Sequence, residues 1–115
     1  MNQTKNLKQY PQTINRPSTL ADLKQRATSG RVSDVDFLME NFDLSRTFSR
    51  YKVIDYALSL VSSAEGQARI RHFLFNGSQI QRNYAALYFK RRGNVQLIVE
   101  AVQRGCIDEL QGYSN

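Results

Sequence analysis

The residues best suited to chemistry in this sequence are a run of three cations, one histidine and one cysteine. Lys90, Arg91 and Arg92 stand together, and ammonium and guanidinium groups of this kind neutralise the phosphates of a nucleic-acid backbone. The same run suits the end of a helix, where cations oppose the negative end of the helix dipole by roughly 0.3–1 kcal/mol each. We interpret the run as a helix terminus. The alternative is a phosphate-contacting patch joined by Arg82 and by Arg46, Arg50 and Lys52.

The histidine and the cysteine lack the partners that catalysis needs. His72 falls on the polar face of an amphipathic stretch, beside Arg69 and Arg71, and we expect it to be solvated. Cys106 follows a glycine and precedes Ile107, so we expect it to be a partly buried apolar filler. A single cysteine excludes an internal disulfide and a multi-cysteine zinc site. We therefore expect no catalytic residue, no metal ligand, no cofactor and no small-molecule substrate.

The carboxylates near residue 40 do not form a calcium loop. Asp34, Asp36, Glu40 and Asp43 match no calcium-loop spacing, and the first two stand where acids favour a helix N-terminus. We expect these four side chains to have structural roles.

Composition is typical of a soluble globular chain. The 115 residues are 41% hydrophobic and 23% charged, enough for one domain with a modest core. No apolar run is long enough to span a bilayer, and the first residues lack the apolar core of a secretory signal. We therefore expect a cytoplasmic protein that does not enter a membrane.

Positive charge is concentrated in the middle of the chain. The net charge is +6, but residues 19–43 carry −2, residues 44–93 carry +7 and residues 94–115 carry −2. Such a segment favours acidic partners, among them nucleic acid, which makes backbone binding through residues 44–93 the alternative function.

The distribution of polar and apolar residues predicts an all-α fold. Residues 1–17 contain both prolines and many amides, so we expect a flexible tail before a single helical domain at 18–115. Ser18, Ser33 with Asp36, Ser45 or Thr47, Ser63, Ser78 with Gln81, and Asn94 are predicted helix starts, while glycines at 30, 77, 93 and 105 are predicted ends.

The apolar faces predict three helical hairpins, at about 18–43, 46–77 and 78–105. Residues 51–62 and 79–92 are apolar around most of their circumference, so each needs neighbours on more than one side. Phe75 points away from the apolar face formed by Ile70, Phe73 and Leu74, so we expect a second neighbour or a partner chain to cover it. Shifting the chain by 28 residues superposes Tyr56 on Tyr84 and Gly77 on Gly105.

The segment RNYAALYFKRRGNVQLIVEAVQRG resembles the short HEAT-like repeats found in phycobilisome lyases. The positions that carry the resemblance are Arg82, Ala85, Ala86, Leu87, Gly93, Leu97, Ile98 and Ala101. Gly93-Asn94 stands where that family usually has an Asp-Pro turn. The resemblance implies a stacked α-α superhelix whose surface binds another macromolecule, and it transfers no catalytic residue.

These observations lead to one expected function, a non-catalytic interaction module. The partner would be another protein, with a second copy of this chain as one option, and nucleic acid is the alternative. The candidate contact residues are Arg69, Arg71, Arg82, Lys90, Arg91 and Arg92.

Overall fold

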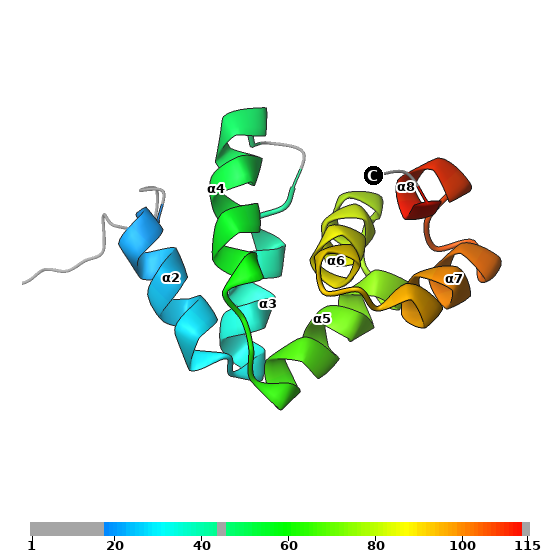
Figure 1. Ribbon diagram of the computed structural model, residues 1–115. Coiled ribbons are helices and arrows are strands. Elements are labelled where there is room, and N and C mark those ends of the chain that lie inside the picture. Colours follow the sequence, from blue (N-terminus) through cyan, green and yellow to red (C-terminus); the bar gives the residue numbers. More distant parts are fainter. Residues whose placement is uncertain (1–17, 44–45, 114–115) are drawn as a thin grey trace, which may run out of the picture.

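The chain is all-α over the residues that the structure describes, which confirms the predicted fold class. The structure is a computed structural model that describes residues 18–43 and 46–113, so the predicted tail at 1–17 lies outside it. Within these residues seven helices follow one another (Figure 1), namely α2 (Leu20–Ser29), α3 (Val32–Glu40), α4 (Phe48–Ser59), α5 (Ala64–Asn76), α6 (Gln79–Arg91), α7 (Val95–Gln103) and α8 (Glu109–Tyr113). None of these helices combines the length and the apolar character needed to cross a membrane.

Side-chain caps define three of the predicted helix starts. Thr47 accepts a hydrogen bond from the Arg50 amide at the start of α4, and Ser63 accepts one from the Gly66 amide at the start of α5. Ser78 begins α6 in a full capping box, since its hydroxyl accepts from the Gln81 amide at 3.2 Å and its own amide donates to Gln81 Oε1 at 2.9 Å. Ser45 lies outside the described residues.

Three other predicted starts need correction. The cap of α2 is Thr19, which forms a capping box with Asp22, so the prediction of Ser18 was wrong by one residue. The predicted box of Ser33 with Asp36 is absent, because α3 begins immediately after the turn at Gly30 and its N-cap is Arg31. Asn94 stands at the N-cap of α7 but makes no capping hydrogen bond with its side chain.

Each helix packs on at least one helix that is adjacent to it in the sequence, and several also pack on the helix two places further along the chain. Contacts join α2 to α4, α4 to α6, α6 to α8, and α3 to α5. In Figure 1, α2, α3 and α4 lie together at one end, α6, α7 and α8 lie at the other, and α5 passes between them. The pairing differs from the predicted hairpin at 46–77, because α5 packs on α3 and α6 while its contact with α4 is marginal at most.

A single hydrophobic core runs through the described residues. It includes Leu23 of α2, Leu38 of α3, Ile54 of α4, Leu74 of α5 and Tyr88 of α6, all fully buried. The two helices predicted to need neighbours on several sides, α4 and α6, lie centrally and each contact several others. The Phe42 ring stacks on the Tyr84 ring at 4.3 Å and so joins the end of α3 to α6.

Candidate functional site

Two of the six predicted contact residues form ion pairs with carboxylates of other helices. Arg69 of α5 donates from Nε to Asp36 Oδ1 at 2.6 Å, which ties α5 to α3. Arg91 of α6 donates from Nη1 to Asp55 Oδ1 at 3.0 Å and from Nη2 to Asp55 Oδ2 at 2.9 Å, which ties α6 to α4. The hydrogen bond to Asp55 raises the pKa of Arg91 above its ordinary value. A planar guanidinium paired in this two-pronged way has fewer donors left for phosphate.

Three more of these cations donate to backbone carbonyls. Arg82 reaches the Cys106 carbonyl at 2.6 Å and the Gly77 carbonyl at 2.8 Å. Lys90 reaches the Gln111 carbonyl at 2.8 Å. Arg92 donates to the Val61 carbonyl at 2.8 Å and lies over the Tyr88 ring at 3.8 Å. These contacts connect α6 to the ends of its neighbours.

Arg71 is the exception among the six. It is exposed on α5 and makes no hydrogen bond or ion pair with the described residues. The structure therefore does not gather the six predicted residues into one free basic patch, because five of them are engaged within the chain.

Arg46 and Arg50 form a second basic pair at the start of α4. Arg46 Nε lies 3.7 Å from Asp43 Oδ2. Arg50 Nε and Nη2 are buried without a hydrogen-bond partner. Burial, with a smaller contribution from Arg46, lowers the pKa of Arg50. None of the hollows described below is lined by either arginine.

Among the described residues, neither of the two residues considered for catalysis has an acid or a base as its hydrogen-bond partner. His72 is exposed on α5, with Nδ1 3.5 Å from Asn76 Nδ2. Cys106 is partly buried, and its thiol lies 3.7 Å from the Phe75 carbonyl. The structure holds no group of three histidine, cysteine, aspartate or glutamate residues placed to bind a metal over the residues it describes. The predicted absence of catalytic residues stays a prediction.

Phe75 obtains its second neighbour from within the chain. The Arg104 guanidinium lies 4.3 Å from the centre of the Phe75 ring, and the ring packs at the edge of the core. A partner chain is not needed to cover it.

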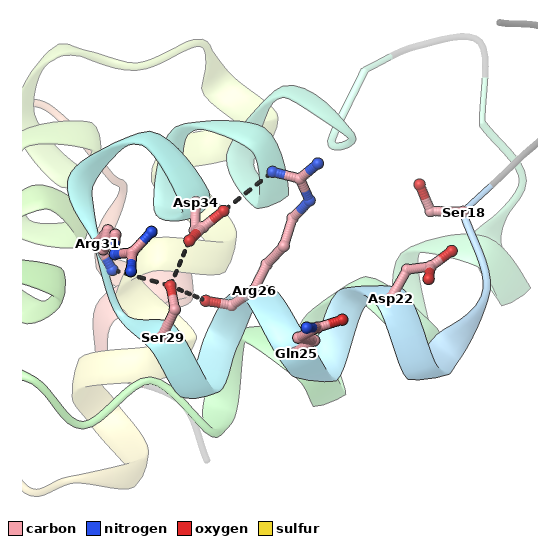
Figure 2. A pocket seen from close by; sticks show the side chains of 7 residues that line it. All are labelled: Ser18, Asp22, Gln25, Arg26, Ser29, Arg31 and Asp34. Atoms are coloured by element: carbon pink, nitrogen blue, oxygen red, sulfur yellow. Dashed lines mark hydrogen bonds and ion pairs between the residues drawn. The ribbon is translucent and has the colours of Figure 1, made fainter. Parts of the chain in front are cut away.

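A polar hollow opens between α2 and α3. Figure 2 shows its lining, in which Arg26 pairs with Asp34 at 2.9 Å and the Ser29 hydroxyl donates to the same carboxylate. Asp22 is occupied by the capping box of α2. The contacts of Arg26 and Ser29 with Asp34 join α2 to α3 at this hollow of about 450 Å³, which is also lined by Gln25 and Arg31.

Two larger hollows meet on the first turns of α6. One, of about 790 Å³, lies towards the end of α3, and the other, of about 490 Å³, lies towards the turn between α7 and α8. Both are lined by Gln79 and Asn83, so together they form one surface, which we call the α6 groove.

Acidic side chains line the α6 groove at both sides. Glu40 and Asp43 contribute from the end of α3, and Asp108 and Glu109 contribute from the start of α8. The only cation in this lining is Arg82, whose donors are directed at carbonyls. The Gln79 and Asn83 carboxamides make no hydrogen bond with the described residues, so both can pair with a ligand.

Sequence reasoning missed this groove, although a signal was present. Residues 19–43 and 94–115 are the two acidic segments, and they flank the basic segment 44–93. The fold brings carboxylates of both segments to α6, while five cations of the middle segment, Arg69, Arg82, Lys90, Arg91 and Arg92, bond to groups elsewhere in the chain.

Comparison with family models, with curated proteins and with solved structures gives no match for this chain.

Proposed function

We propose that this protein is a non-catalytic module that binds another protein through the α6 groove. The observation that carries the proposal is the groove itself, a broad hollow surface on which the Gln79 and Asn83 carboxamides and the Glu40 and Glu109 carboxylates make no hydrogen bond or ion pair with the described residues. His72 and Cys106 contact amide and backbone groups rather than an acid or base, which supports a role without catalysis.

We further propose that the helices form a short HEAT-like superhelix of two layers. The contacts of α2 with α4, α4 with α6 and α6 with α8 support one layer, and the contact of α3 with α5 supports the other. In repeat arrays each unit contacts its neighbours only, which leaves extended surfaces open to partners. The α6 groove would lie on such a surface.

Binding to nucleic acid is the weaker proposal. A protein that grips phosphates needs several free cations, and affinity then falls steeply with salt. Here Arg69, Arg91 and Arg92 are held by carboxylates or carbonyls of other helices. The larger hollow of the α6 groove presents carboxylates, which repel phosphate.

Site-specific photocrosslinking tests the proposed function. A benzophenone amino acid placed at Asn83, in the groove, should cross-link one specific protein in the cells that make this chain. The same group at Ala68, exposed on α5 and outside the groove, is the control. The purified partner should then bind the wild-type chain directly. If both positions give the same background of cross-links, the groove is not a protein-binding surface and the proposal fails.

A further inference from the structure

We infer that the α6 groove binds an extended, lysine- or arginine-rich segment of its partner. The inference rests on the proposed function and names the chemistry of the partner for the same groove. Three features of the groove lead to it, namely its charge, the spacing of its carboxamides and its fixed apolar floor.

The charge of the groove is opposite to that of the protein. The chain has a net charge of +6, yet the groove is lined by four carboxylates and a single guanidinium. One of the four, Asp43, pairs with Arg46 at 3.7 Å, so Glu40, Asp108 and Glu109 supply the negative charge that is not neutralised by an ion pair with the described residues. Glu40 and Glu109 are exposed and make no ion pair with the described residues. At physiological salt, charges more than about 8 Å away are largely screened, so a ligand in the groove feels the local carboxylates more than the distant cations.

The carboxamides are spaced to match an extended peptide. Gln79 and Asn83 are four residues apart on α6, so they project from successive turns about 6 Å apart along the axis. An extended strand repeats every two residues, over roughly 6.6 Å. Each carboxamide carries a donor and an acceptor, so the pair can bond to alternate peptide groups of one strand.

On its α3 side, the floor of the groove is apolar and held in place. Phe42 is 2% exposed and stacks on Tyr84, and Ile80 lines the groove beside it. Gln81 Nε2 donates to the Met39 carbonyl at 3.0 Å and fixes the start of α6 against α3. The aliphatic stem of a lysine or arginine can lie on such a floor while its charged end reaches Glu40.

Fluorescence anisotropy with a defined peptide tests this inference. The probe is a labelled nine-residue peptide that alternates lysine with threonine, and the counter-probes are its glutamate-for-lysine analogue and a labelled DNA single strand. Against the whole chain, we expect the lysine peptide to bind and both counter-probes to fail. Binding of either counter-probe in place of the lysine peptide would overturn the inference.

Matched variants locate the binding to the groove. Glu40→Gln with Glu109→Gln should weaken the lysine peptide about tenfold, since exposed ion pairs each contribute up to about fivefold. Glu65→Gln with Glu100→Gln removes the same charge outside the groove and should change affinity less than about twofold. An equal loss in both double variants would mean that the peptide senses overall charge alone, and the groove assignment would be withdrawn.

The carboxamides are tested in the same way. Gln79→Ala with Asn83→Ala should weaken the peptide at least fivefold, because two paired side chains are lost. Gln96→Ala with Gln103→Ala, both exposed on α7, should have no effect. If Gln79→Ala with Asn83→Ala leaves the affinity unchanged, the carboxamides do not bind the peptide. The inference that the bound segment is an extended strand would then be withdrawn.

The experiments distinguish failure of the proposed protein binding from failure of the inference about a basic, extended segment. If the crosslinker at Asn83 captures a specific partner while the lysine peptide does not bind, the groove binds protein and only the basic, extended chemistry is wrong. If neither experiment succeeds, the proposed function falls as well.

Discussion

At the scale of single residues, several arginines of α5 and α6 connect helices to one another. Arg91 donates to both carboxylate oxygens of Asp55, and Arg92 donates to the carbonyls of Ser59, the last residue of α4, and of Val61 just beyond it. A rigid guanidinium fork suits such contacts better than a lysine ammonium. The positive charge of residues 44–93 therefore contributes to the fold.

Arg50 is the residue whose replacement we expect to stabilise the protein. It stands at the third position of α4, where a cation opposes the helix dipole, and its Nε and Nη2 are buried without a partner. Arg50→Glu would complete a capping box with Thr47 and place an acceptor near Arg46. We expect the free energy of unfolding to rise by about 1 kcal/mol, measured by urea denaturation followed by circular dichroism.

Arg50→Lys is the control for that change. It keeps the positive charge and cannot complete the box, so the free energy of unfolding should not increase. An equal gain in both variants would show that capping and charge are not the cause.

At the scale of elements, the joint between α2 and α5 depends on close approach of the backbone. The Ser63 hydroxyl donates to the Gly30 carbonyl at 2.7 Å and accepts from the Gly66 amide at 3.0 Å. Gly30 has φ +65°, a left-handed conformation that glycine adopts without strain. One hydroxyl thus joins the end of one helix to the start of another.

Gly66→Ala should break this joint. A Cβ at Gly66 would lie 2.6 Å from Val61 Cγ1 and 2.7 Å from Ser63 Oγ, closer than packed atoms can approach. We expect a loss of about 1–3 kcal/mol in the free energy of unfolding, as for overpacked cores, despite the better helix propensity of alanine. Thermal denaturation measures the loss.

Gly93→Asn serves as the comparison. Gly93 also has positive φ, but a Cβ there would meet open space, and asparagine tolerates this conformation. The change should cost at most about 1 kcal/mol. If Gly66→Ala were equally mild, the approach of α2 and α5 would be looser than the structure indicates.

At the scale of the whole molecule, one core and a series of contacts between alternate helices connect the described helices, so we expect them to unfold together. The rings of Phe42, Tyr51 and Tyr84 lie within 6.1 Å of one another at their centres and join the end of α3, α4 and α6. A change in the charge of this cluster should therefore affect global unfolding.

Alkaline pH tests that expectation. Burial raises the pKa of Tyr84 above the ordinary 10.0, with the Asp55 carboxylate adding to the effect. Below pH 10, Tyr84 is protonated in the folded and in the unfolded chain, so its ionisation costs no stability. As the pH rises towards the higher folded pKa, the unfolded chain releases the Tyr84 proton first, and the free energy of unfolding falls. In Tyr84→Phe the denaturation midpoint should fall less between neutral pH and the alkaline range than it does in the wild type.

Tyr56→Phe, on the exposed face of α4, is the reference for that measurement. It should follow the wild type across the same pH range. If Tyr84→Phe also follows the wild type, ionisation of the aromatic cluster does not contribute to alkaline unfolding.

The sequence alone determined where most helices begin and end. The boxes and caps at Ser63 and Ser78, and the left-handed glycines at 30, 93 and 105, depend on hydrogen bonds and dihedral angles within a few residues, so they can be read locally. The helix periodicity of Leu97, Ile98 and Ala101 is local for the same reason. The error at Ser18 against Thr19 is one residue, because both side chains can cap and only the position of Asp22 favours the second.

Only the tertiary structure decided what the charged residues do. Arg91 and Asp55 are 36 residues apart, as Arg69 and Asp36 are 33 apart, and a long cation finds its partner only after the helices have become neighbours. The same holds for the α6 groove, whose carboxylates come from residues 40–43 and from residues 108–109. Local patterns fix helices because their interactions span one turn, whereas surfaces depend on which helices pack, and that is settled by the whole core at once.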